Sequence, residues 1–183
     1  MSNRERWILT FNKAAKRSNK MFTPLTLLGF IFFLTFNIGF ISLALWLDNV
    51  LKLPGYLPMP WNLIIATPVL LFGLFFMFWS VGNFLKAKGT PVPFNPPKIL
   101  VIAGPYAYSR NPMMTGLFGL LFGLGILLNS IMLTFLITPL IIFIAVMQIK
   151  KIEEPELEMR FGNDYLEYKE RVPMFWPKWK SDL

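Results

Sequence analysis

Long hydrophobic segments without charge alternate with shorter polar segments along the chain. Residues 24–47 and residues 61–85 are the first two, and neither contains Asp, Glu, Lys or Arg. Each can cross a bilayer as a helix, because about 20 apolar residues at roughly 1.5 Å per residue span the hydrocarbon core. We predict a transmembrane helix in each segment, and we expect Pro68, and Pro139 further along, to kink their helices.

The third hydrophobic segment, residues 113–147, is too long for one helix at ordinary tilt. Its middle carries Asn129 and Ser130, a polar pair suited to a turn. We therefore predict a tight helical hairpin with spans near residues 113–128 and 131–149. The predicted fold is an all-α integral membrane protein with four transmembrane helices.

Glycines at helical spacing occur in the first arm of this hairpin. Gly119 and Gly123 have the small-xxx-small spacing that lets two membrane helices approach closely. We expect them to pack the two arms of the hairpin against each other. Room for a flat ligand between the helices is the alternative.

The basic residues lie almost entirely on one side of the predicted spans. Of 18 Lys and Arg residues, only Lys52 falls in the first connection, and the hairpin turn has none. Positively charged segments stay on the cytoplasmic side, so we predict a multi-pass protein with both termini in the cytoplasm. The chain has no Asn-x-Ser/Thr sequence, which is compatible with the bacterial inner membrane that we expect as its location.

Short cytoplasmic helices are predicted at both ends of the chain. Residues 1–23 place apolar residues at helical spacing with Lys and Arg turned away, as in an amphipathic helix on a membrane surface; a disordered basic tail is the alternative. We expect two transmembrane helices in residues 24–85 and a functional core in residues 86–183. In that core, Gly162 is predicted to cap one short helix in the αL conformation, and Asn163 to cap the next, which Val-Pro at 172–173 ends.

The composition excludes several kinds of active site. Charged residues make up 15% of the chain and hydrophobic ones 55%, whereas soluble domains carry about 25% charge. The absence of Cys and His rules out disulfides, thiolate nucleophiles and His-based catalysis, and we expect no metal site. The net charge of +8 fits an anionic inner leaflet, so the bilayer is the expected partner and nucleic acid is not.

Two polar segments on the predicted cytoplasmic side could carry chemistry. Residues 89–116 are rich in proline and contain Arg-Asn-Pro at 110–112, where a helix start offers free N–H groups. The second segment opens with Glu153 and Glu154, directly after the last span. A bound cation would relieve the repulsion between these carboxylates. An ordinary loop and a solvated helix face are the alternatives.

These segments match two motifs that occur together in a known family. The first is Leu-Val, Gly-x-Tyr and Arg-His-Pro opening a membrane helix; the second is Glu-Glu, Phe-Gly-x-x-Tyr-x-x-Tyr and Arg-Val-Pro. Here they stand as Leu100-Val101, Gly104-Pro105-Tyr106 and Arg110-Asn111-Pro112, then Glu153-Glu154, Phe161 to Tyr168 and Arg171-Val172-Pro173. Over about residues 86–177 the chain resembles the isoprenylcysteine carboxyl methyltransferase family, whose wider group includes the phosphatidylethanolamine N-methyltransferases.

The resemblance implies a membrane methyltransferase that uses S-adenosylmethionine. Its acceptor would be lipophilic, such as a lipid amine, a small carboxylate or a thiol, and would react at the cytoplasmic face. Asn111, Arg110 and Glu153 would take the catalytic positions. By position, the methyl donor would contact Lys98, Ile99, Leu100, Val101, Tyr106, Asn111, Pro112, Met113, Met114, Glu153 and Glu154.

Three residues depart from the family pattern. Asn111 replaces the usual His and cannot titrate near neutral pH, and Met114 replaces a Tyr. Ile149 stands where prenylcysteine-specific members have an Arg, which disfavours a prenylated protein as substrate. A membrane reductase using NADPH and a non-catalytic scaffold are the alternatives. The reductase is disfavoured because a dinucleotide phosphate requires several basic contacts, whereas the second segment opens with two Glu residues.

Overall fold

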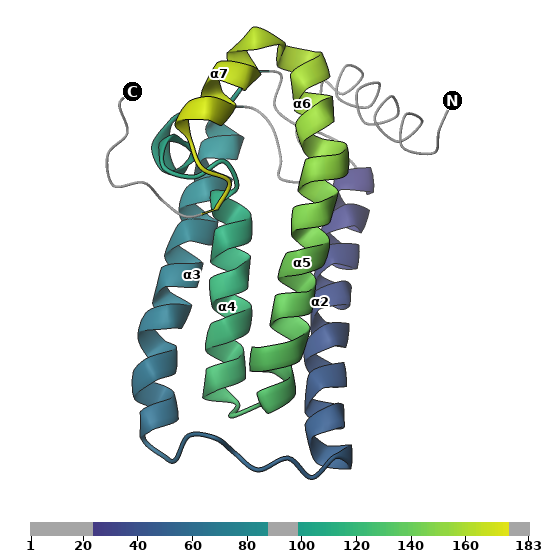
Figure 1. Cartoon of the computed structure of the whole chain (residues 1–183), viewed down its shortest axis with the longest axis vertical. Helices are drawn as coiled ribbons and strands as arrows, with labels where there is room; N and C mark the ends of the chain where they lie inside the picture. The colour runs from purple at the N-terminus through teal and green to yellow at the C-terminus, as the bar shows by residue number, and fades with distance from the viewer. Residues whose placement is uncertain (1–23, 88–98, 176–183) are drawn as a thin grey trace.

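The computed structural model describes residues 24–87 and 99–175, and the statements below concern these residues. Within them the chain is helical and contains no strand. Four helical segments stand side by side as a bundle, and short helices cover one end of it (Figure 1). The predicted amphipathic helix in residues 1–23 lies outside the described residues, and so does Lys98.

The boundaries of the helices follow the hydrophobic segments closely. The bundle is formed by α2 (Pro24–Val50), α3 (Trp61–Lys86), α4 (Pro112–Leu127) and α5 (Thr138–Gln148). The end of the bundle is covered by the 3₁₀ turn η1 (Gly104–Ala107), α6 (Glu154–Phe161) and α7 (Asn163–Arg171). Two π-helical segments, η2 (Leu133–Ile137) and η3 (Ile149–Glu153), flank α5. The predicted ends of α3 and α4 lie within about one residue of the observed ends.

Three helices are long and apolar enough to cross a membrane: Leu27–Val50, Trp61–Lys86 and Leu133–Phe161. The remaining apolar helix, α4, has 16 residues and is roughly 24 Å long. Three of the four predicted spans are therefore long and apolar enough to cross a membrane. The fourth, α4, is shorter than a full span. Only 6% of the most apolar window of α2 is buried, as expected for a helix in contact with lipid.

The second arm of the hairpin continues through two π segments into α6. Pro139 and Pro155 each follow a π segment by two residues. Proline lacks an N–H and its ring clashes with the carbonyl four residues earlier, and a wider turn relieves both problems. The end predicted near residue 149 is thus a π turn and not a break. The helix Leu133–Phe161 spans roughly 40 Å and carries no charge before residue 150, so its charged end projects beyond the hydrocarbon core.

Glycines bring α3 and α4 into backbone contact. A Cβ atom added at Gly73 would lie 2.8 Å from the carbonyl oxygen of Gly116, and one added at Gly116 would lie 2.7 Å from that of Gly73. Gly119 and Gly123 also face α3, so the expectation that they pack the hairpin was wrong about the partner helix. Gly125 is the glycine that meets the other arm of the hairpin. The contact between Gly73 and Gly116 places the start of α4 directly beside α3.

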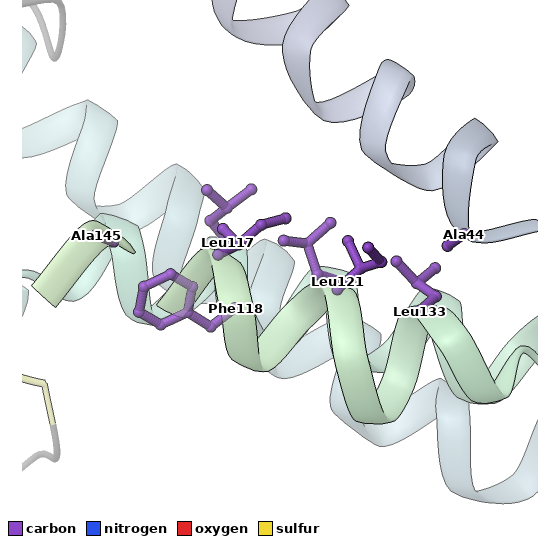
Figure 2. Close-up of a cluster of buried hydrophobic side chains, with 8 residues drawn as sticks. Ala44, Leu117, Phe118, Leu121, Leu133 and Ala145 are labelled. Carbon is purple, nitrogen blue, oxygen red and sulfur yellow. The ribbon is translucent and has the colours of Figure 1, made fainter. Parts of the chain in front are cut away.

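A cluster of buried apolar side chains joins α2, α4 and the second arm of the hairpin (Figure 2). Leu121 and Leu133 are the most buried large members, at 2% and 0% exposure. The members are Ala44, Leu117, Phe118, Leu121, Leu133, Ile137, Ile141 and Ala145. The cluster packs the second arm of the hairpin against α2 at Ala44, toward the end of α2.

The predicted turn at Asn129 and Ser130 is confirmed, and its side chains form hydrogen bonds at the end of the bundle away from α6. Asn129 accepts hydrogen bonds from the backbone N–H groups of Tyr56 and Leu57, both at 2.9 Å. Ser130 donates to the carboxylate of Asp48 at the end of α2. These bonds join the hairpin turn to the end of α2 and to the connection between α2 and α3.

The predicted caps of the short helices were only partly right. Gly162 ends α6 with a positive φ of 58°, but its ψ of −131° is not that of the αL conformation. Gly162 is also the N-cap of α7, and Asn163 is the first residue of that helix. As predicted, α7 ends at Arg171, directly before the Val-Pro pair.

Candidate functional site

The two sequence motifs meet at the end of the bundle that α6 and α7 cover (Figure 1). Arg110, at the start of α4, lies at the centre of this region. Its Nη1 atom lies 2.5 Å from Oε1 of Glu154, and its Nε donates to the carbonyl oxygen of Val172 at 2.9 Å. The Arg110 side chain is 10% exposed. It therefore joins the start of α4, the start of α6 and the segment after α7.

Glu154 uses both carboxylate oxygens in ion pairs. Its second oxygen, Oε2, lies 2.8 Å from Nζ of Lys169, which also contacts Glu158 at 2.9 Å. The hydrogen bonds to these two carboxylates raise the pKa of Lys169. Glu154 is buried, so its carboxylate is held by the protein and is not free for a ligand.

Glu153 has very different surroundings from its neighbour. Its side chain is exposed, and its carboxylate has no hydrogen bond or ion pair within the described part of the chain. Loss of hydration, followed by the nearby charge of Glu156, raises its pKa to about 7; Arg160 opposes this rise and Glu154 adds to it. Glu153 therefore differs from Glu154 in that no side chain of the described residues forms an ion pair or hydrogen bond with its carboxylate.

Tyr106 lies close enough to Glu153 to feel its charge. Burial, then Tyr168 and Glu153, raise the pKa of Tyr106, and its hydroxyl interacts with Ser80 of α3. The side chain is 6% exposed, and its ring packs on that of Phe84 at 5.2 Å between centroids. The proline-rich strip and the paired acids are therefore adjacent in space.

The two tyrosines of α7 hold this arrangement together. Tyr168 donates a hydrogen bond of 2.7 Å to the carbonyl oxygen of Tyr106. Burial, then the charge of Glu154, raises the pKa of Tyr165 to about 12, and burial followed by Tyr165 raises that of Tyr168. Both hydroxyls are neutral at physiological pH and serve as hydrogen-bonding groups.

Asn111 holds the segment that follows α7. This segment, residues 172–175, is called the C-terminal strap below. The backbone N–H and the side-chain Nδ2 of Asn111 donate to the carbonyl oxygen of Met174, at 3.0 and 3.2 Å. Thr115 donates to the carbonyl of Phe175 at 3.1 Å, and the Phe175 ring lies 5.5 Å from that of Phe118. Sequence reasoning missed the strap, because backbone carbonyl contacts leave no mark in the pattern of side chains.

The other predicted contact residues are dispersed around this region. Ile99 is exposed, whereas Leu100 packs against the cluster of Tyr165, Tyr168 and Val172. A pocket of about 500 Å³ opens between Leu100 and α7. Val101 and Met113 are half-buried, Pro112 is buried, and Met114 packs against the core cluster. Of the predicted contact residues that the structure describes, only Ile99 and Leu100 line this pocket.

Comparison with known families gives one match. A family model described as phospholipid methyltransferase matches residues 61–164, which is more than half of the chain. The chain belongs to the phospholipid methyltransferase family. The match includes α3, the hairpin and both carboxylates of the Glu-Glu pair. Searches of curated proteins and of solved structures found no significant match. Membership of the phospholipid methyltransferase family, with the apolar helices, supports a membrane methyltransferase related to lipid.

Proposed function

We propose that the protein transfers a methyl group from S-adenosylmethionine to a lipophilic acceptor at the cytoplasmic face of the membrane. A lipid amine is the first candidate acceptor, ahead of a small carboxylate or a thiol. The family supports methyl transfer. The observation that carries the proposal is the division between the paired acids, because Glu154 is held by Arg110 and Lys169 while Glu153 stays accessible beside Tyr106.

The residues present fit such a donor. S-adenosylmethionine supplies a methyl group on a sulfonium cation, and it also carries an ammonium and a carboxylate group. An unpaired carboxylate such as that of Glu153 favours the cationic groups, and the neighbouring Tyr106 favours them through its aromatic face. Arg110 and the C-terminal strap position the start of α4 beside α6 and α7.

The roles of the three expected catalytic residues then differ. Glu153 binds the donor directly. Arg110 and Asn111 act as positioning residues, since their side chains bond to Glu154, Val172 and Met174. A lipid ammonium group must lose one proton before its nitrogen can attack the methyl group, which leaves the sulfonium as a neutral thioether, and the carboxylate of Glu153 is the candidate to accept that proton.

The test is binding followed by transfer. Isothermal titration in detergent is expected to show binding of S-adenosylmethionine and S-adenosylhomocysteine, weakened at least about tenfold in Glu153→Gln. Glu170→Gln is the matched control, because it removes the same charge from an exposed position on α7. Transfer is then read as a mass increase of one methyl group on phosphatidylethanolamine in vesicles, or on another component of a lipid extract.

Three results would overturn the proposal. Folded protein that fails to bind either nucleoside in several detergents contradicts use of this donor. Binding of NADPH in place of the donor would favour the reductase, and binding of the donor without turnover on any lipid extract would favour the non-catalytic scaffold.

A further inference from the structure

Glu156 and Arg160 form an incompletely satisfied charged pair on α6. Their side chains are 9% and 12% exposed, and Nε of Arg160 lies 3.6 Å from Oε1 of Glu156, too far for a hydrogen bond. Oε1 of Glu156 and both Nε and Nη1 of Arg160 are buried without a hydrogen-bond partner. The guanidinium also lies over the ring of Phe161, 4.6 Å from its centroid.

This state is unfavourable for the protein alone. Buried charged groups in native proteins are almost always hydrogen-bonded, because an unpaired buried charge loses its hydration without compensation. Burial disfavours the charged form of both groups: it raises the pKa of Glu156 and lowers that of Arg160. A guest with complementary charges would use the free donors and the free acceptor.

The pair belongs to the same face of the helix as Glu153. Positions 153, 156 and 160 are separated by three and four residues, a spacing that places side chains on one face. Glu153 interacts electrostatically with both members of the pair. Glu154 and Glu158 lie on another face, where they bind Arg110 and Lys169. The unsatisfied pair therefore lies on the same face of the helix as Glu153, the carboxylate that the proposed function assigns to the donor.

We propose that this face of α6 is a subsite for a zwitterion, in which Arg160 binds an anionic group and Glu156, with Glu153, binds an ammonium group. The inference rests on the proposed function and identifies the amino-acid end of the methyl donor as the ligand. An α-amino acid carries both charges on one carbon atom, which suits two side-chain charges only 3.6 Å apart. A phosphoethanolamine headgroup has the same two charges, but further apart.

The experiment compares two nucleosides that differ only in this end. S-adenosylhomocysteine has the amino acid, and 5′-methylthioadenosine has the same adenosine and sulfur without it. Arg160→Gln is expected to raise the Kd for S-adenosylhomocysteine at least about tenfold while leaving that for methylthioadenosine unchanged. Glu156→Gln is expected to act in the same direction. Lys52→Gln, which removes a positive charge at the far end of the bundle, is the control and should change neither Kd.

Each outcome separates this inference from the proposed function. If wild-type protein binds neither nucleoside, the proposed function itself fails. If it binds both and the Arg160 and Glu156 variants change both equally or not at all, the subsite is wrong and the proposed function stands. If the variants instead raise only the KM for phosphatidylethanolamine vesicles, the zwitterion bound is the headgroup and the assignment to the donor is overturned. Arg160→Lys, which keeps the charge, provides a second variant should Arg160→Gln fail to fold.

Discussion

Glu153 and Glu154 are adjacent in the chain, yet one is held by the protein and the other is available to a ligand. The difference arises from the phase of the helix, because consecutive residues of a helix point about 100° apart. Glu154 points toward Arg110 and Lys169, and Glu153 points toward Tyr106 and Arg160. The sequence predicts the pair as a functional site but could not divide the roles, since both residues fit the motif equally.

Glu153→Gln is expected to stabilise the folded protein at high pH. The folded state raises the pKa of Glu153 from 4.5 to about 7, so between these values the folded protein holds a proton that the unfolded chain has lost. Stability therefore falls as pH rises through this window, and the loss persists above pH 7. Thermal unfolding in detergent, followed by Trp fluorescence, should give a higher Tm for the variant at pH 8 and equal values near pH 4.5. An equal or lower Tm at pH 8 would contradict this environment for Glu153.

The affinity of the wild-type protein for the donor is expected to change with pH in the opposite sense. Only the ionised carboxylate attracts the cationic donor, and its fraction rises about tenfold between pH 6 and pH 8 for a pKa near 7. Titration at both pH values should show a lower Kd at pH 8, whereas Glu153→Gln should show no such change. A flat profile in the wild-type protein would exclude Glu153 from the binding step.

At the scale of elements, the site depends on three contacts that fix the start of α4. α3 holds it through glycines, α6 holds it through the ion pair of Arg110, and the C-terminal strap holds it through Asn111. The glycine spacing in α4 signalled a close helix contact, but it could not say which helix was the partner. The strap had no signal at all beyond the Val-Pro that ends α7. The elements and the hairpin turn were predictable from local pattern, but the contacts of α4 with α3 and with the strap were not.

Gly116→Ala is expected to separate α3 from α4. The new methyl group would lie 2.7 Å from the carbonyl oxygen of Gly73, which is backbone and cannot rotate away. Such overpacking costs about 2 kcal/mol, and it should lower Tm and weaken donor binding together. Gly82→Ala in α3 is the control, because nothing lies within 4 Å of its added Cβ, and it should be neutral or stabilising. Equal Tm values for the two variants would show that the close contact is absent.

Arg110→Gln is expected to destabilise the protein by about 3 kcal/mol, because it leaves the buried carboxylate of Glu154 with only Lys169 as partner. Arg171→Gln is the comparison, since its pair with Glu167 is exposed and such pairs contribute about 0.5 kcal/mol or less. Adding Glu154→Gln to Arg110→Gln should recover part of the loss. Similar unfolding midpoints for the two single variants in a denaturant titration would rule out a buried ion pair.

For the whole molecule, basic residues are distributed unequally between the two ends of the bundle. Three spanning helices and the shorter α4 place the charged end of Leu133–Phe161 opposite the connection that holds Lys52. We propose that the end with α6 and α7 lies in the cytoplasm, following the bias of basic residues. Segment length made the apolar helices predictable from sequence, because the required length is set by the bilayer and not by specific contacts. The orientation stays a prediction.

The orientation can be measured directly because the sequence contains no cysteine. Lys52→Cys and Glu170→Cys each introduce a single thiol at an exposed position. In intact bacterial cells with a permeable outer membrane, a membrane-impermeant maleimide is expected to label position 52 and to reach position 170 only after lysis. Labelling of both positions from the same side would contradict the proposed topology.

The C-terminal strap also has a consequence for synthesis. Membrane helices enter the bilayer in the order in which the ribosome makes them, and residues 172–175 emerge after all the helices of the bundle. The carbonyl groups that Asn111 and Thr115 bond therefore arrive only when α4 is already in place. A chain that ends before Met174 would keep the helices of the bundle but would lack the carbonyl groups that Asn111 and Thr115 bond.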